Sequence, residues 1–356
     1  MIVTPLFDRP IEYPRAWSAA DFEDLDALAV SLSPRHLAAL DRELNRALER
    51  GAGVDEIGVG DFPLPEMEAW FADLRQRLLF GAGVALVTNF PVGNYSRNEL
   101  EIIYWGFGTH LGVGCSQSVM GDKVGHVHDT SDQDVNARAY RNKQKLTLHT
   151  DLCDFICMLS VTQAACGGVS RYASALGIHN FLRVHQRRSL EILYRGFHMY
   201  RLGEHGPGES ECTPWRVPVF SNLEGTVSCR WVRFYIEAAA NLLESPLTDE
   251  EFEALEVLDA AAEREGTVFE RLLAPGELSI TNNYTVLHSR SAFEDDKGTS
   301  ARRLLYRLWL NSDDAPPVVP EIDLFAERGI PHQAGQRPSG EGELLRSMVD
   351  KGRARA

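Results

Sequence analysis

The chain has 356 residues, of which 44% are hydrophobic and 24% charged, a composition typical of a soluble globular protein with a sizeable core. The formal net charge of −15 argues against a nucleic-acid-binding protein, because contacts to phosphates need clustered Lys and Arg. There is no CxxC pair, no apolar run as long as a membrane span and no signal-peptide pattern, so we expect a cytoplasmic protein with reduced thiols and no membrane partner.

The segment before about residue 82 is predicted to be mainly helical. Leucines at three- and four-residue steps within residues 34–50 predict an amphipathic helix that ends near Gly51. Residues 64–81 predict a second amphipathic helix, and the β-prone run VALVTNFP follows it. Ser96 and Glu99 have the spacing of a capping box, which predicts a further helix.

Residues 111–145 are polar and irregular in pattern. A long stretch of this kind inside a compact domain is usually functional, so we predict a flap beside a site. From composition alone, Arg138 and Tyr140 are candidate substrate contacts in this flap, as are His126 and Arg141.

Strands and helices alternate irregularly through the rest of the chain. KLTLHTD and FICMLSVTQAA predict strands, Ser174 caps the helix that follows, and residues 195–235 predict a mixed β segment. Thr248 and Glu251 form a second capping-box pair, and two β-prone runs, GELSITNNYTVLHSR and RRLLYRLWLNS, come last. This pattern favours a β-rich core flanked by helices over a regular βαβ fold.

The run LTLHTDLCDFICML contains a histidine and a carboxylate two residues apart, His149 and Asp151. Residues two apart on a strand face the same side, so this pair can form half a metal site. His288, in the first of the two final β-prone runs, is the candidate third ligand. Two histidines and one carboxylate form the facial triad of non-haem Fe(II) oxygenases. An H-x-D pair also arises by chance, and GHVHDTSD in the flap supplies rival donors.

A basic cluster follows His288 after about fifteen residues. An oxygenase that uses 2-oxoglutarate must hold the distal carboxylate of this cosubstrate several ångströms from the iron, and a buried arginine can bind it with two hydrogen bonds. Arg303 and Arg307 share one face of the predicted strand, whereas Arg302 lies on the opposite face.

The motifs HTD, GGVSRYAS, NNYTVLHSRSAFED and RRLLYRLWL, in this order, resemble those of the taurine dioxygenase-like family of Fe(II)/2-oxoglutarate-dependent dioxygenases, and most closely its clavaminate synthase-like branch. The similarity spans about residues 83–312. It implies a mainly β fold with α additions, a double-stranded β-helix (jelly roll) with N-terminal helices and a helical insertion. We expect one domain over residues 1–312, helical to about residue 82, and a surface-wrapping or flexible tail at 313–356.

The resemblance also implies roles for the residues of the site. His149, Asp151 and His288 become the catalytic iron ligands. Related halogenases have a small residue in place of the carboxylate, so Asp151 favours oxygenation or desaturation over halogenation.

Further residues are implied to hold the cosubstrate or the substrate. Arg303 is favoured for the distal carboxylate of 2-oxoglutarate, with Arg302 as the alternative. Ser170 of GGVS either donates to the same carboxylate or closes a turn. Arg307 binds an acidic group of the substrate or supports the site, and Gln117 matches a polar position near the cosubstrate.

We therefore expect an enzyme that uses Fe(II), 2-oxoglutarate and O₂ to hydroxylate or desaturate an unactivated C–H bond, producing succinate and CO₂. The expected partner is a small substrate of anionic or amino-acid-like character, and the oligomeric state stays open. Two alternatives are a zinc-dependent hydrolase with the same triad, which has no use for the arginine pair, and a non-catalytic jelly-roll binding protein, which has no need of all three ligands.

Overall fold

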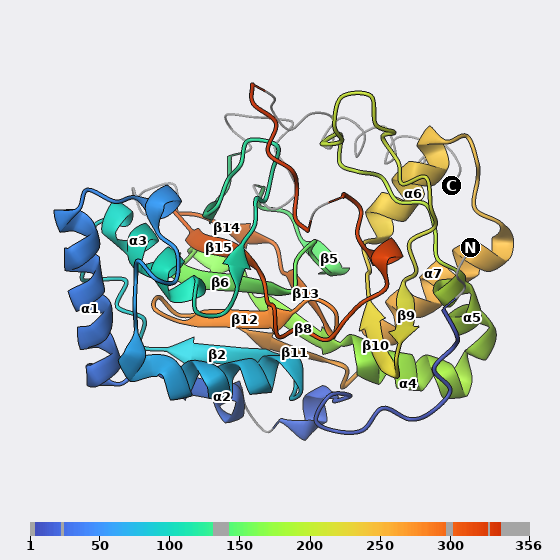
Figure 1. Cartoon of the computed structure of the whole chain (residues 1–356). Helices are drawn as coiled ribbons and strands as arrows, with labels where there is room; N and C mark the ends of the chain where they lie inside the picture. Colours follow the sequence, from blue (N-terminus) through green and yellow to red (C-terminus); the bar gives the residue numbers. More distant parts are fainter. Residues whose placement is uncertain (1–3, 23–24, 131–141, 297–301, 327, 336–356) are drawn as a thin grey trace.

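The structure is a computed structural model that describes residues 4–22, 25–130, 142–296, 302–326 and 328–335. Helices α1–α3 lie at one end of the molecule and α4–α7 at the other, with the strands between them (Figure 1). In the described part of the chain, no helix combines the length and the apolar character that crossing a membrane requires.

The N-terminal helices form where the sequence predicts them. They are α1 (Pro34–Glu49), α2 (Glu68–Leu79) and α3 (Arg97–Gly108), with short 3-10 turns at Ala19–Asp21, Leu25–Leu28, Val54–Glu56 and Pro65–Met67. The Ser96 side chain accepts from the Glu99 backbone N–H, and the Glu99 carboxylate accepts from the Ser96 N–H. This reciprocal capping box fixes the start of α3.

The larger sheet has the strand order β1-β2-β12-β6-β15-β3, and β4 also pairs with β15. Only β1 and β2 run parallel among these pairs; the others are antiparallel. The strands are β1 (Ala29–Ser31), β2 (Val84–Thr88), β3 (Val113–Gly114), β4 (Gly125–Val127), β6 (Phe155–Thr162), β12 (Leu278–Asn282) and β15 (Leu304–Asn311).

The smaller sheet has the order β11-β8-β13-β5 and is antiparallel throughout. Its strands are β5 (Leu146–His149), β8 (Ser170–Ser174), β11 (Val268–Arg271) and β13 (Val286–Arg290). Two short ladders lie outside these sheets, β7 (Cys166–Gly167) with β14 (Phe293–Glu294) and β9 (Phe220–Leu223) with β10 (Thr226–Cys229). Residues of both sheets line one pocket, so the sheets face each other and confirm the predicted β-rich jelly-roll class.

The two faces of the larger sheet pack against different parts of the molecule. Alternate residues of its strands pack under α1–α3 in one hydrophobic cluster, which on β15 comprises Leu304, Tyr306, Leu308 and Leu310. The residues between them, such as Leu305 and Arg307, face the interior between the sheets. The period of two therefore turns one face to the helices and the other to the pocket.

A helical insertion separates β8 from β11. It contains α4 (Ala175–His185), α5 (Arg187–Arg195), α6 (Arg233–Leu242) and α7 (Asp249–Ala262). Ser174 caps α4 and Thr248 caps α7, as predicted. The expectation for residues 195–235 is only partly correct, because α6 begins at Arg233 and β structure is limited to β9, β10 and two isolated bridges.

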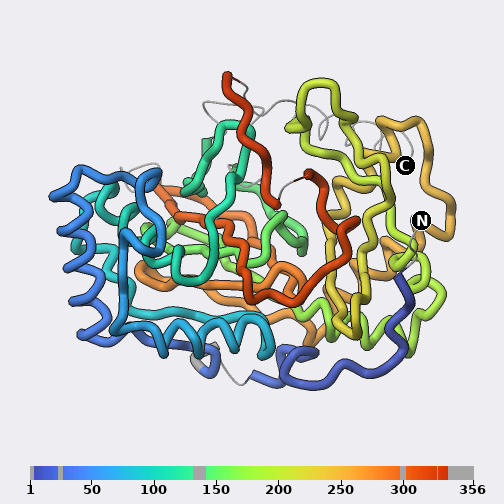
Figure 2. The backbone as a smooth tube through the Cα atoms, viewed as in Figure 1, coloured from blue at the N-terminus to red at the C-terminus, as the bar shows by residue number. Residues whose placement is uncertain are grey.

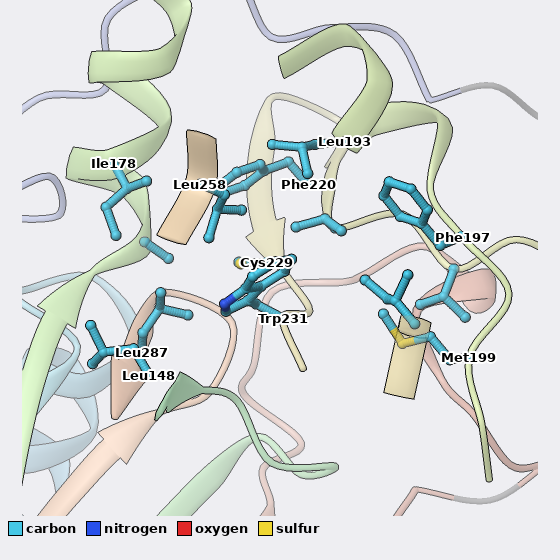
Figure 3. Close-up of a cluster of buried hydrophobic side chains, with 14 of the residues drawn as sticks. Leu148, Ile178, Leu193, Phe197, Met199, Phe220, Cys229, Trp231, Leu258 and Leu287 are labelled. Carbon is cyan, nitrogen blue, oxygen red and sulfur yellow. The ribbon is translucent and has the colours of Figure 1, made fainter. Parts of the chain in front are cut away.

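The insertion packs against the back of the smaller sheet. Figure 3 shows side chains of the insertion, among them Trp231 and Leu258, gathered in one cluster with Leu148 of β5 and Leu287 of β13. Because successive strand residues face opposite sides, this packing turns the neighbouring His149 and His288 away from the insertion and towards the pocket.

Two predicted strands differ in extent from the observed ones. Strand β5 ends at His149, so Asp151 lies in the loop after it rather than on the strand. The run 276–290 divides into β12 and β13 at the turn formed by Asn283, Tyr284 and Thr285. Both breaks are local departures from periodicity that a β-prone composition does not reveal.

The described residues of 313–335, here called the C-terminal strap, pack on the strands and the insertion (Figure 2, red segment after β15). Its buried side chains include Ile322 in the 3-10 turn Pro320–Ile322, Leu324 and Ile330. The backbone N–H of Gly329 donates to the Leu152 carbonyl, so the strap lies directly against the loop that carries Asp151.

Candidate metal centre

The two histidines of the candidate centre meet across neighbouring strands. His149 of β5 and His288 of β13 are directly opposite in the antiparallel register, and their ring centroids are 4.5 Å apart. Directly opposed residues on one face of a sheet are in contact range, so strand pairing alone brings the imidazoles together.

Asp151 reaches the same point from the loop after β5. Its backbone N–H donates to Asn283 Oδ1 at 3.0 Å, and its carbonyl accepts from the Arg230 guanidinium. Its side-chain Oδ2 accepts from the Trp309 indole N–H at 3.0 Å. The backbone and the side chain of Asp151 are therefore both held in place by the protein.

The donor atoms of His149, Asp151 and His288 all lie within 4.8 Å of one another. The His288 Nε2 to Asp151 Oδ2 distance is 3.8 Å. Two imidazoles and one carboxylate are the donor set of a facial triad, which leaves coordination positions for other ligands. The residues present thus fit the Fe(II) ion that the sequence predicts.

The protonation states of the histidines suit metal binding. The His149 ring nitrogen Nδ1 lies 2.7 Å from the Thr147 carbonyl, which favours a proton on Nδ1 and leaves Nε2 as the donor atom. Burial, with the charge of His149 and Arg307, lowers the pKa of His288 to about 3, although Asp151 acts in the opposite direction. His288 is therefore neutral at pH 7 and can bind a cation.

Asp151 is held as an anion. Burial by itself raises the pKa of this carboxyl, but Arg307, the two histidines and the Trp309 N–H together outweigh burial and lower it. The nearest Arg307 nitrogen, Nη1, lies 3.7 Å from Asp151 Oδ2. The carboxylate is thus ready to bind a metal cation at pH 7.

Gln117 fixes Arg307 instead of reaching the pocket. Its side-chain amide donates to the carbonyls of Lys123 and Arg307, and its Oε1 accepts from Arg307 Nε at 2.6 Å. The pocket is lined without Gln117. The structure therefore places Gln117 behind Arg307 and outside the pocket lining, away from the position that was predicted for it near the cosubstrate.

The pocket lies between the two sheets and extends from His149 and His288 to Arg303. Its walls come from β4, β5, β6, β8, β12, β13 and β15, and the lining residues include Val127, Leu146, Ile156, Met158, Ser170, Tyr172, Ser279, Thr281, Arg290, Arg303 and Arg307. One wall is apolar, and the charged groups stand at the metal centre and at the arginines. The lining thus joins the triad and Arg303 in one space.

Arg303 lies just before β15 and is only 2% exposed. Its Nε and Nη1 have no hydrogen-bond partner in the described part of the chain. Burial, with the charge of Arg290, lowers its pKa to about 9, so it remains a cation at pH 7. A buried cation with unsatisfied donors is costly, and an anionic ligand relieves this cost.

The GGVS motif shapes the wall beside Arg303. Gly167 and Gly168 have φ values of +75° and +74°, and a Cβ atom at Gly168 would lie 2.8 Å from Arg303 Nε. Glycine is required here both for the turn and for the close approach of the guanidinium. The turn belongs to the glycines, while Ser170 begins β8 and lines the pocket.

Of the other predicted site residues, the two that the structure describes, Arg302 and His126, lie outside the pocket lining. Arg302 is exposed and outside the lining. His126 is also exposed, and its Nε2 lies 2.9 Å from Glu101 Oε1. Arg138, Tyr140 and Arg141 fall outside the described residues.

Sequence reasoning missed four residues that matter at this site. Arg290 follows His288 by two positions and Trp309 follows Arg307 by two, so strand alternation could have identified both. Asn283 comes from the turn between β12 and β13, and Arg230 follows β10 in the insertion. No local pattern relates these two to Asp151, because only the tertiary fold brings them together.

Comparison with known proteins identifies the family. The family model described as "Taurine catabolism dioxygenase TauD, TfdA family" matches residues 44–309. The chain is 27% identical over 315 residues to the FR-33289 synthase of Streptomyces rubellomurinus, covering 87% of this chain and 92% of that protein. It is 24% identical to the taurine hydroxylase-like protein SAT17 of Stachybotrys chartarum, covering 84% and 79% of the two chains.

Solved structures share the fold at lower identity. An asparagine oxygenase matches with a TM-score of 0.61 and 16% identity, covering 80% of this chain and 94% of that chain. The non-haem iron oxygenase OrfP matches with a TM-score of 0.58 and 13% identity at the same coverage.

The chain belongs to the TauD, TfdA family of dioxygenases. This membership, with a His-Asp-His donor set in the structure, confirms the predicted enzyme class, an Fe(II)- and 2-oxoglutarate-dependent dioxygenase that acts on a small molecule.

Proposed function

We propose that His149, Asp151 and His288 hold Fe(II) in this dioxygenase, and that the product is a hydroxylated small molecule. One observation carries the assignment: two imidazoles and a carboxylate converge in a pocket that also holds the buried, unsatisfied guanidinium of Arg303. Bound there with 2-oxoglutarate, Fe(II) supplies the activation of O₂ that oxidation of an unactivated C–H bond requires.

Arg303 binds the distal carboxylate of 2-oxoglutarate in this proposal, and the Ser170 hydroxyl donates a hydrogen bond to the same carboxylate. Both line the pocket, whereas the alternative arginine, Arg302, is exposed. A guanidinium presents paired donors that match the two oxygens of a carboxylate. A zinc hydrolase with the same triad gives Arg303 no role, which disfavours that alternative.

Arg307 supports the metal ligand in this proposal and does not bind the substrate. It lies 3.7 Å from Asp151 and is held by Gln117, so its charge keeps the carboxylate ionised and oriented. The apolar wall formed by Val127, Ile156 and Met158 excludes water from the space between Arg307 and Arg303.

We infer that the substrate is a small molecule of amino-acid-like character. The asparagine oxygenase that shares this fold was solved with 2S,3S-3-hydroxyasparagine and succinate, and OrfP with (3S)-hydroxy-L-Arg. Identity to both is low, so they support a class of substrate and no particular compound. Because Arg307 is engaged with Asp151, an acidic substrate group has to be recognised elsewhere.

The first test is an anaerobic titration of the metal-free protein with Fe(II) and 2-oxoglutarate. Chelation of iron by the keto acid gives a visible charge-transfer band, which we expect in the wild type and not in His149→Ala. His126→Ala is the matched control, since this exposed histidine lies outside the pocket and should leave the band unchanged.

A wild-type protein that binds Fe(II) but gives no band with 2-oxoglutarate would contradict the assignment. The substrate class is tested separately, by succinate formation with a panel of free amino acids, their acylated derivatives and taurine. Stimulation by an amino acid supports the inference, and stimulation only by compounds without an amino-acid group overturns it.

A further inference from the structure

Arg290 is a second buried arginine in the same pocket, and the proposed function gives it no role. It is 6% exposed and lines the pocket. It follows the metal-binding His288 by two positions on β13, so both side chains face the interior between the sheets. Its Nε and Nη1 are buried and have no hydrogen-bond partner in the described part of the chain.

Arg290 and Arg303 flank the same aromatic ring. Each guanidinium carbon lies 4.8 Å from the centroid of the Phe293 ring. Ser170, which lines the pocket beside them, is the register partner of Arg290 on the neighbouring strand β8. Two guanidinium groups and one hydroxyl therefore stand together at the end of the pocket assigned to the cosubstrate.

The positive charges of Arg290 and Arg303 at this end of the pocket favour binding of an anion. Asp129 and Asp295 act electrostatically on Arg290 and Arg303 respectively, but neither carboxylate lines the pocket. Between them, the two arginines keep four buried nitrogen donors without a partner among the described residues. A carboxylate has about four lone-pair sites and can accept from both guanidinium groups at once.

The remaining nitrogen of Arg290 points to the chain that leads into the metal centre. Its Nη2 donates to the carbonyl oxygens of Asn142 at 2.8 Å and of Gln144 at 2.6 Å. These residues come directly before β5, which ends at His149. One guanidinium thus joins the arginine end of the pocket to the segment that enters the metal-binding strand.

We propose that Arg290 is a second contact for the distal carboxylate of 2-oxoglutarate, shared with Arg303, and that it couples binding of the cosubstrate to the position of residues 142–144. This inference rests on the proposed function. It adds a residue that binds the distal carboxylate and a physical link from that carboxylate to residues 142–144.

The test uses two keto acids and three matched variants. Anaerobic titration of the Fe(II)-loaded protein gives the dissociation constant of 2-oxoglutarate and of 2-oxopentanoate, which lacks the distal carboxylate, from the charge-transfer band. Arg290→Met should weaken 2-oxoglutarate by about 10- to 100-fold, the range expected for loss of a charged hydrogen bond. The same variant should change 2-oxopentanoate by less than about twofold, and so should Arg302→Met with either acid. Arg303→Met is the reference for a full contact.

The outcomes separate the possible roles of Arg290. Equal weakening of both keto acids would mean that Arg290 only anchors residues 142–144, and unchanged 2-oxoglutarate binding would mean that it makes no contact; either overturns the proposal. If Arg290→Met does not fold, Arg290→Lys, which keeps the charge but not the paired donors, should show a smaller loss confined to 2-oxoglutarate. A wild type without any band would instead reject the proposed function.

The coupling has its own readout. In the wild type, 2-oxoglutarate should slow hydrogen exchange of the backbone amides in residues 142–145, and 2-oxopentanoate should do so less. In Arg290→Met held at saturating 2-oxoglutarate, this protection should be lost. Equal protection in the variant would overturn the proposed link to residues 142–144.

Discussion

Asp151 at one end of the pocket and two arginines at the other end differ in how their polar groups are hydrogen-bonded. At the metal end, Asp151 uses its backbone N–H, its carbonyl and its Oδ2 in hydrogen bonds to three other residues, Asn283, Arg230 and Trp309. At the cosubstrate end, Arg303 and Arg290 keep buried donors that no described residue satisfies.

This difference follows from what each end has to bind. A metal ligand must be oriented before the ion arrives, so the protein itself supplies the bonds that hold the carboxylate. An arginine that binds a carboxylate must keep its donors available, at a cost in stability that the bound anion offsets. The hydrogen bonds to Asp151 therefore suit a metal ligand that is positioned in advance, and the unpartnered donors of Arg303 and Arg290 suit recognition of an incoming anion.

The largest effect is expected from removal of a metal ligand. Asp151→Ala should lower the rate of substrate-dependent succinate formation by about a thousandfold or more, because metal-ion catalysis contributes several kcal/mol. Iron binding measured by equilibrium dialysis should fall with it. A variant that retains iron and activity would show that the carboxylate is not a ligand.

Replacement of Arg303 should have opposite effects on the affinity for 2-oxoglutarate and on the stability of the protein without cosubstrate. Arg303→Met should weaken 2-oxoglutarate by about a hundredfold, since the lost contact is between buried charges. Without cosubstrate, the same change should raise the melting temperature, because it removes a buried charge whose donors lack partners. Thermal unfolding with and without 2-oxoglutarate measures both effects, and Arg302→Met provides the exposed control. A lowered melting temperature without cosubstrate would contradict the comparison of the two ends.

A smaller effect is expected behind the metal ligand. Trp309→Phe keeps the packing but removes the N–H that donates to Asp151 Oδ2. Loss of such a supporting hydrogen bond typically weakens metal affinity by about 10- to 100-fold, and we expect the lower part of this range because the other two bonds to Asp151 remain. Competition with a chelator gives the affinity. An unchanged value would mean that Asn283 and Arg230 orient Asp151 without help.

The smallest effect on catalysis is expected from a histidine outside the pocket. Burial, followed by the charge of Arg183, lowers the pKa of His179 to about 4, against 6.5 for an ordinary histidine. Between these values the unfolded chain binds more protons than the folded protein, so stability is lost as the pH falls from 6.5 towards 4, by roughly 3 kcal/mol.

His179→Gln should therefore flatten the pH dependence of the unfolding free energy, measured in urea at several pH values, and leave activity at pH 7 unchanged. A variant with the wild-type slope would assign the acid sensitivity to other groups. This separates the acid stability of the fold from events at either end of the pocket.

Much of this site could be predicted from the sequence because strand alternation carries the information. The H-x-D spacing pointed to His149 and Asp151, and strand parity pointed to Arg303 and Arg307. His288 was identified from the basic cluster that follows it and from the family resemblance, and the structure places it opposite His149 on a paired strand. The fold class followed from the order of the motifs.

The sequence was less informative where function depends on contacts between distant segments. Arg307 lies beside Asp151 and is hydrogen-bonded by Gln117, and the sequence left open whether it binds the substrate or supports the site. Arg230 reaches Asp151 from the insertion, and its neighbours in sequence give no sign of this. Helix α6 was missed because its residues follow β-prone segments that continue to Cys229.

The C-terminal strap has a consequence for how the protein is made. A ribosome delivers His149 and Asp151 long before Trp309 and the strap, and chains fold from the N-terminal part first. The strap residue Arg328 forms an ion pair with Asp154, in the loop of Asp151. During translation, the loop of Asp151 lacks its contacts with the Trp309 indole and the Arg328 guanidinium until those residues have been made. The contacts of Trp309 with Asp151 and of Arg328 with Asp154 therefore form only after those later residues have been made, so the proposed metal site is completed well after its first two ligands are synthesised.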